Sequence, residues 1–72
     1  MQGVNLKLLQ TFVLVADHAS FRRAAEVANR APSAISMQVR DLEAQVGMRL
    51  FVRTAQRISL TPEGQALYDR TH

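Results

Sequence analysis

Apolar side chains recur every three or four residues through most of the chain, which is the spacing of one face of an α-helix. The first such segment runs from about Asn5 to Asp17. Asn5 is a suitable N-cap, because its side chain can accept a hydrogen bond from a free backbone N–H of the first turn. The pattern therefore predicts a helix whose apolar positions are Leu6, Leu9, Phe12, Val13 and Ala16.

A second helix is predicted over Phe21–Ala28, with Ser20 as its N-cap. Its apolar face carries alanines, which let another helix cross at close range. A three-residue connection, residues 29–31, leads to Pro32. Proline is tolerated in the first turn of a helix and damaging inside one, so a third helix must begin at about this residue.

The third helix is predicted to span residues 32–46 and to end at Gly47, with an apolar stripe of Ile35, Val39, Leu42 and Val46. Two short helices joined by a three-residue turn form the outline of a helix-turn-helix. If the apolar stripe faces inward, the outward positions are Ser33, Met37, Arg40 and Ala44, with Ser36 on the flank. Short side chains, hydroxyls and an arginine suit a helix that enters a major groove, and they equally fit an ordinary solvated face.

Beyond the third helix the spacing changes to the alternation of polar and apolar residues that is typical of strands. We predict strands at Arg49–Val52 and Arg57–Leu60, with residues 53–56 as the tip of a hairpin. Arg53 and Arg57 bracket this tip. Arginines on such an element can reach backbone phosphates or a minor groove; the alternative is a solvated turn with two free arginines.

A fourth helix is predicted after the hairpin. Thr61 is a suitable N-cap, and Pro62 takes the first helical position. The helix continues through Leu67 and Tyr68 to the last residue, His72.

Positive charge is concentrated in the middle of the chain. The net charge of the 72 residues is +3, but the segment from Arg22 to Arg57 alone carries seven arginines against three acidic residues. Arginine has a planar fork that suits phosphates and guanine edges. The alternative is a basic surface that only keeps the protein soluble. Together with the helix-turn-helix outline, the concentration of arginines favours contact with nucleic acid.

Composition argues against several other classes of protein. With 72 residues the chain holds one small domain, and the absence of cysteine excludes disulfides and cysteine-based zinc sites. His18 and His72 lie too far apart to form a short-range ligand pair, so we expect no metal and no cofactor. No apolar run approaches the ~18 residues of a membrane span, and the start lacks signal-peptide features. We therefore expect no membrane association, and the cytoplasm is the expected compartment.

Catalytic arrangements are also not indicated. Asp41 and Glu43 are two residues apart on a helix and point in different directions, which gives no paired-carboxylate geometry. The glycines are too dispersed for a phosphate loop. None of the serines considered has a neighbouring histidine; these are Ser20, Ser33, Ser36 and Ser59. We predict that the chain has no catalytic residues and is not an enzyme.

Four segments match a known family in order and spacing. They are residues 20–25 (SFRRAA), 32–43 (PSAISMQVRDLE), 46–53 (VGMRLFVR) and 60–64 (LTPEG). Together they resemble the N-terminal DNA-binding domain of LysR-type transcriptional regulators. The resemblance extends over nearly the whole chain from Asn5 onward, which makes it far more specific than a single motif.

The resemblance implies a mainly α winged helix-turn-helix with three core helices, a two-stranded β-hairpin wing and the start of a fourth, linker helix. The winged domain would comprise residues 1–61 and the linker residues 62–72. In this arrangement helix 32–46 reads the major groove of double-stranded DNA, and wing 49–60 touches the flanking backbone or minor groove. Family members assemble as dimers or tetramers through the linker helix.

The resemblance also implies which residues contact DNA. By position these are Pro32, Ser33, Ser36, Met37, Arg53 and Arg57, and the helical wheel alone adds Arg40. Many members carry glutamine where this chain has Pro32, and arginine where it has Met37. Both changes remove hydrogen-bonding groups, so base preference does not transfer, although Met37 can contact a thymine methyl.

The function we predict is sequence-specific binding of double-stranded DNA in a bacterial transcription regulator. The alternative is a winged-helix module whose exposed third-helix face meets an acidic protein partner. The family's ligand-sensing domain, which resembles a periplasmic binding protein, is absent from the 72 residues. We therefore expect the DNA-binding domain of a longer protein, with a natural short protein as the alternative.

Overall fold

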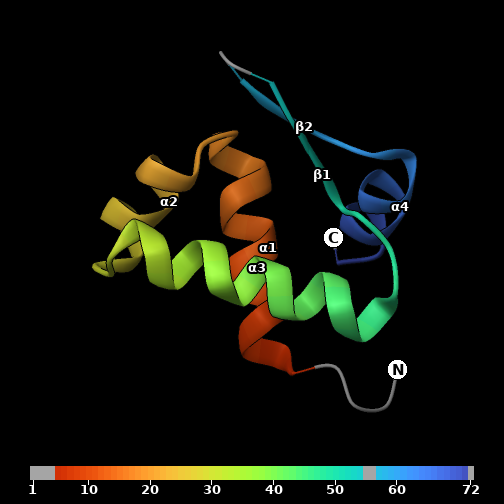
Figure 1. The fold of residues 1–72 in the computed structure, drawn as a ribbon, viewed down its shortest axis with the longest axis horizontal. Helices are drawn as coiled ribbons and strands as arrows, with labels where there is room; N and C mark the ends of the chain where they lie inside the picture. The colour runs from red at the N-terminus through yellow and green to blue at the C-terminus, as the bar shows by residue number, and fades with distance from the viewer. Residues whose placement is uncertain (1–4, 55–56, 72) are drawn as a thin grey trace.

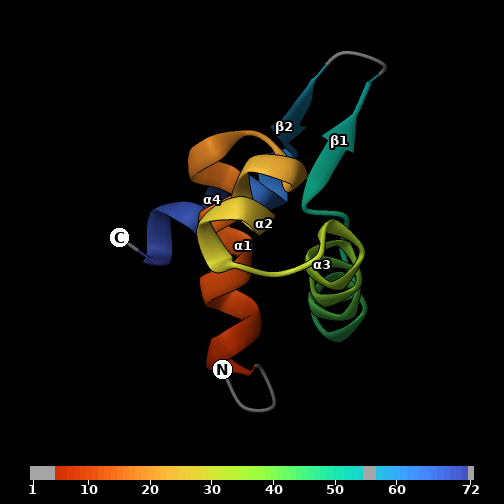
Figure 2. The same ribbon diagram turned by 90° about the vertical axis from the view of Figure 1, so that its left-hand side faces the viewer.

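The computed structural model describes residues 5–54 and 57–71. In this part of the chain the elements are α1 (Leu6–His18), α2 (Phe21–Ala28), α3 (Pro32–Val46), β1 (Phe51–Arg53), β2 (Ile58–Leu60) and α4 (Pro62–Thr71). Figure 1 shows α3 running across α1, with α2 beside them and the β-hairpin projecting beyond the helices. Figure 2 shows the hairpin standing away from the helical body, with α4 on the far side of α1 from α3. The predicted winged helix-turn-helix is confirmed, while Ala55, Gln56 and His72 of the predicted elements lie outside the described residues.

Local capping explains where the helices begin and end. The Asn5 side chain accepts a hydrogen bond from the backbone N–H two residues on, at 2.8 Å, and Ser20 accepts one from three residues on, at 3.0 Å. At the other ends, Ala19, Asn29 and Gly47 adopt left-handed backbone conformations with φ of 51°, 58° and 73°. Asn29 and Gly47 suit this conformation, and the predicted bounds of the second and third helices are confirmed.

The core lies where α1, α2 and α3 meet the base of the hairpin. On α3 the predicted stripe is confirmed, since Ile35, Val39 and Leu42 are buried and Val46 is half-buried. The buried apolar residues are Leu8, Phe12, Val15, Ala24, Ala25, Ile35, Val39, Leu42, Leu50 and Phe51. The two small alanines of α2 fit a close helix crossing.

The predicted apolar face of α1 is confirmed for four of its five residues, since Phe12 lies in the core and Leu9, Val13 and Ala16 pack against it partly buried. The buried stripe also continues to Leu8 and Val15, while Leu6 is 68% exposed. α1 is apolar around most of its circumference, so more than one stripe has helical spacing, and packing against α2 and α3 selects among them. On the α3 side, the Thr11 hydroxyl lies 2.7 Å from the Gln38 side-chain oxygen, which joins the two helices.

The two strands form an antiparallel hairpin in which Phe51 pairs with Leu60 and Arg53 with Ile58. Successive strand residues face opposite sides, so this register puts Phe51 and Arg53 on one side of β1. Both strands are shorter than predicted. β1 begins at Phe51 rather than Arg49, and it includes Arg53, which was predicted in the tip. Before β1, the Leu50 N–H is bonded to the Glu43 carboxylate and the Arg49 carbonyl oxygen to the Thr61 hydroxyl.

α4 is joined to the rest of the fold at its first turn. As predicted, Thr61 caps it, with its hydroxyl accepting from the Gly64 N–H at 2.9 Å. Leu67 and Tyr68 pack against the core. The Tyr68 hydroxyl donates a hydrogen bond to the Asp17 carboxylate, and this bond raises the pKa of Tyr68 because it stabilises the protonated phenol.

The close approach of Gly64 to the Leu50 backbone can be tested through protein stability. Gly64 is buried against the chain before the hairpin, and a Cβ at this position would overlap the Leu50 carbonyl oxygen. Although alanine is the better helix former, we expect Gly64→Ala to lower the free energy of unfolding by about 1–3 kcal/mol, because backbone must move. Denaturant unfolding measures this.

The exposed Ala66 on the same helix provides the control. Ala66→Gly should cost only the helix-propensity difference of about 0.5–1 kcal/mol. A Gly64→Ala protein at least as stable as the wild type would contradict the close approach.

Candidate nucleic-acid interface

The exposed face of α3 is formed by the residues that the helical wheel placed outward. Pro32, Ser33 and Arg40 are exposed, and Met37 is 65% exposed. Ser36 is half-buried on the flank that faces the hairpin. The buried stripe holds α3 on the core, so its N-terminal half presents two hydroxyls and a flexible thioether at the surface.

The hairpin carries the other two predicted residues, and they lie in different surroundings. At the far end of the hairpin, the Thr54 hydroxyl and backbone are bonded to the Arg57 backbone at 2.9–3.2 Å. These bonds fix the backbone at this end of the hairpin. The Arg57 side chain is exposed and makes no hydrogen bond or ion pair to any described residue. Arg57 is therefore available to an external anion.

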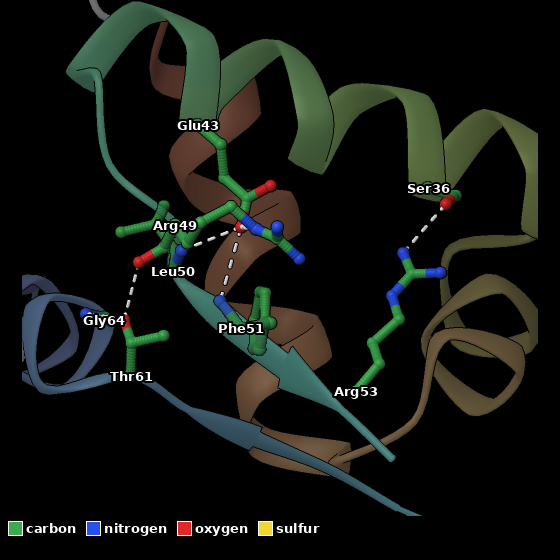
Figure 3. Close-up of polar contacts among 8 residues, drawn as sticks. All are labelled: Ser36, Glu43, Arg49, Leu50, Phe51, Arg53, Thr61 and Gly64. Carbon is green, nitrogen blue, oxygen red and sulfur yellow. Dashed lines mark hydrogen bonds and ion pairs between the residues drawn. The ribbon is translucent and has the colours of Figure 1, made fainter. Parts of the chain in front are cut away.

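Arg53 instead folds back toward the helices. Its Nη2 donates a hydrogen bond of 3.0 Å to the Ser36 hydroxyl oxygen (Figure 3). Its guanidinium carbon lies 4.1 Å from the centre of the Phe21 ring. The structure thus brings together two residues that were predicted independently on the helix and on the wing.

A hollow lies between α3 and β1, and its rim is basic. It is lined by Phe21, Ser36, Val39, Arg40, Glu43, Arg49, Phe51 and Arg53. A second hollow at the connection between α2 and α3 is bordered by Arg22, Arg30 and Pro32. The sequence places Arg30 two residues before α3, but it did not indicate that Arg22, one helix earlier, also lies next to the start of α3. Cationic groups on both sides of one exposed helix fit a polyanion.

Glu43 is a residue whose role the sequence reasoning missed. Its carboxylate accepts hydrogen bonds from the backbone N–H groups of Leu50 at 2.7 Å and Phe51 at 3.3 Å (Figure 3). Arg49 adds a 4.0 Å ion pair, which is weak because its side chain is exposed. In the sequence Glu43 was considered as a catalytic carboxylate, whereas in the structure it fixes the wing to α3.

Thr61 completes the base of the wing. Besides capping α4, its hydroxyl donates to the Arg49 carbonyl oxygen at 2.6 Å, and its N–H donates to the Leu50 carbonyl oxygen at 3.0 Å. The capping role was predictable from the Thr-Pro pair, but the bonds to residues twelve and eleven positions earlier depend on the tertiary fold. Together they place the hairpin beside the exposed face of α3.

Residues 5–54 and 57–71 contain neither a candidate metal cluster nor a helix that could span a membrane. No cluster of three or more histidine, aspartate or glutamate side chains there is suited to a metal ion. In the same ranges no helix is long and apolar enough to cross a bilayer.

Comparison with known families and sequences gives concordant matches. Residues 6–65 match the family described as bacterial regulatory helix-turn-helix protein, lysR family. The HTH-type transcriptional regulator CfxR of Cupriavidus necator is 48% identical over 67 residues, which cover 93% of this chain and 21% of the relative. PtxR of Pseudomonas aeruginosa, another HTH-type transcriptional regulator, is 45% identical over 94% of this chain and 22% of its own length. The chain thus spans about one fifth of the length of these curated relatives.

Solved structures agree with these matches. The BenM_DBD/benA site 1 DNA complex superposes with a TM-score of 0.87 at 33% identity, over 92% of this chain and 74% of the other. Vibrio fischeri DarR, solved in complex with DNA, gives a TM-score of 0.89 at 35% identity, over 96% of this chain and 24% of the other.

The bonds of Glu43 predict that it stabilises the base of the wing. Glu43→Ala leaves two partly buried N–H groups without their acceptor, so we expect the free energy of unfolding to fall by about 1–3 kcal/mol. The matched control is Asp41→Ala on the exposed side of α3, which should change stability by no more than about 0.5 kcal/mol. Equal effects of the two substitutions in urea unfolding would refute the assignment.

Proposed function

Because the chain belongs to the LysR family of bacterial regulatory helix-turn-helix proteins, we propose that it binds specific double-stranded DNA sequences as the DNA-binding domain of a transcription regulator. The observation that carries this function is the contact of Arg53 with Ser36, which joins the wing and the exposed face of α3 into one surface. Solved relatives with the same fold have been captured with DNA, which supports the proposal. The sequence relatives are transcriptional regulators, and we infer that this chain likewise is not an enzyme.

In this function α3 enters the major groove with its N-terminal half. The proposed contact residues on the helix are Pro32, Ser33, Ser36, Met37 and Arg40. The serine hydroxyls suit phosphate oxygens or base edges, and the Arg40 guanidinium suits a phosphate or guanine. Pro32 allows close approach without offering a hydrogen-bonding group, and Met37 suits the methyl group of thymine.

The wing supplies the remaining two proposed residues: Arg57 contacts the DNA directly, and Arg53 acts through its contact with Ser36 on α3. The free Arg57 side chain suits a backbone phosphate or a narrow minor groove beside the bases that α3 reads. A phosphate contact of this kind contributes affinity for every sequence alike.

We further propose that residues 1–61 form the winged domain and that residues 62–72 begin a linker helix through which the full-length protein forms a dimer or tetramer. The much greater length of the relatives leaves room for an effector domain outside these 72 residues. Because such a regulator acts on the bacterial chromosome, we infer that it works in the cytoplasm.

Selection of bound duplexes from a random pool tests the function directly. The proposal predicts a recovered consensus and an affinity for it that falls steeply with salt. Saturable binding to an acidic protein, with no preference for any duplex, would replace the proposal with a protein-interaction module.

Arg57 gives a quantitative prediction for this binding. If it neutralises one phosphate, Arg57→Ala should weaken binding to all duplexes by a similar factor and reduce the slope of log affinity against log salt by about one unit. Fluorescence anisotropy titrations at several salt concentrations measure both quantities. An unchanged slope would remove Arg57 from the contact residues.

The assembly of the isolated chain follows from the length of α4. The helix has 10 residues in the structure, with Gly64 in its first turn, so it offers little surface for a partner helix. We expect this chain to be monomeric or weakly dimeric at micromolar concentration, and to bind a palindromic site far less tightly than a chain that continues the linker. Sedimentation equilibrium without DNA checks the first expectation, and a tight dimer would contradict it.

A further inference from the structure

We propose that Arg53 is a positioning residue that clamps the wing to α3, and that it serves DNA binding through this clamp rather than by neutralising a phosphate. The effect of Arg53 on DNA binding rests on the proposed function, but the clamp itself is a property of the protein without DNA. It is defined by three side chains from three elements: Arg53 on β1, Ser36 on α3 and Phe21 on α2.

A continuous series of aromatic contacts connects the clamp to the core. The buried Phe12 and Phe51 rings are tilted at 50° with their centres 5.4 Å apart. Phe21 meets Phe51 edge-on at 5.9 Å, and Arg53 lies over Phe21. Edge-on and tilted arrangements are favourable for aromatic pairs. The contact with Phe51 therefore holds the Phe21 ring in place independently of Arg53.

The register of the hairpin fixes which residue completes this series. Phe51 and Arg53 are two positions apart on β1 and therefore project on the same side. Phe51 is buried against the helices, and this burial directs Arg53 toward α3 and α2. Val52, between them, faces the other way and is 46% exposed.

The chemistry of the clamp requires arginine. A planar guanidinium can stack on a ring while donating hydrogen bonds at its edge, and it is more weakly hydrated than an ammonium. Lysine supplies the same charge as a point without the planar fork. A phosphate contact, by contrast, would be largely retained with lysine.

The clamp also orients Ser36 for DNA. A hydroxyl has one hydrogen to donate and lone pairs to accept with. Because the Ser36 oxygen accepts from Arg53, its own hydrogen remains available to a phosphate or a base acceptor. Loss of Arg53 therefore disturbs both the place of the wing and the orientation of a proposed contact on α3.

The first test is made on the free protein. Amide order parameters of Val52, Ile58 and Ser59 should fall from about 0.85 toward about 0.6 in Arg53→Gln, because the clamp no longer restrains the hairpin. Arg57→Gln is the matched control, since it removes the same charge from the same hairpin and should leave these amides unchanged. Wild-type order parameters in Arg53→Gln would overturn the clamp.

The second test is made with the selected duplex. We expect Arg53→Gln to weaken binding about three- to tenfold, the effect of one hydrogen bond, with the wild-type salt slope. Arg53→Lys should weaken binding by the same factor as Arg53→Gln. Ser36→Ala removes both the acceptor of the clamp and a proposed DNA contact. In its background Arg53→Gln should therefore add less than about twofold in a double-mutant cycle.

Three results would overturn the positioning role. These are a slope reduced by about one unit in Arg53→Gln, restored affinity in Arg53→Lys, or fully additive losses in the cycle. Failure of the proposed function is distinguishable from all three. In that case the wild-type chain prefers no duplex, whereas the order parameters still decide whether the clamp exists.

Discussion

The peptide groups around Leu50 hold the three parts of this small molecule together. The Leu50 N–H donates to the Glu43 carboxylate on α3, and the Leu50 carbonyl oxygen accepts from the Thr61 N–H at the start of α4. Its side chain is fully buried in the core. The root of the wing, the end of α3 and the first turn of α4 therefore share one point of attachment, and Gly64 closes against the same carbonyl.

Such an attachment is needed because the hairpin has little stability of its own. A two-stranded hairpin is at best marginally stable in water, and each strand here has three residues. A domain of this size also has only a modest core, which offers few apolar contacts to stabilise the hairpin. The wing is instead fixed by polar bonds at its base and by the contact of Arg53 with Ser36 farther out. Two separated points of attachment determine its direction, which a single point would leave open.

The sequence predicted the helices well and the tertiary bonds not at all. Bounds such as Pro32–Val46 follow from a proline, a glycine and a spacing that are all local. The burial of Leu8 and Val15 on α1 was not predicted, because a helix that is apolar on most sides has no unique inward direction without its neighbours. The bonds of Glu43 and Arg53 join residues 7 to 17 positions apart, and they exist only once α3 and β1 lie side by side. At the candidate site, exposure along α3 was predicted correctly, and the roles of the individual side chains stay predictions.

In the proposed function, affinity and specificity come from different parts of the surface. Arginines on both sides of α3 offer charge to a phosphate backbone, and such contacts are blind to sequence. The exposed N-terminal half of α3 offers few groups that can discriminate bases, since Pro32 has no donor or acceptor in its side chain and Met37 only a thioether. When so few groups read the bases, an error in the placement of any one of them costs a large share of the discrimination. A short wing fixed rigidly beside Ser36 is then of most value not for its charge but for holding the reading helix in register with the groove.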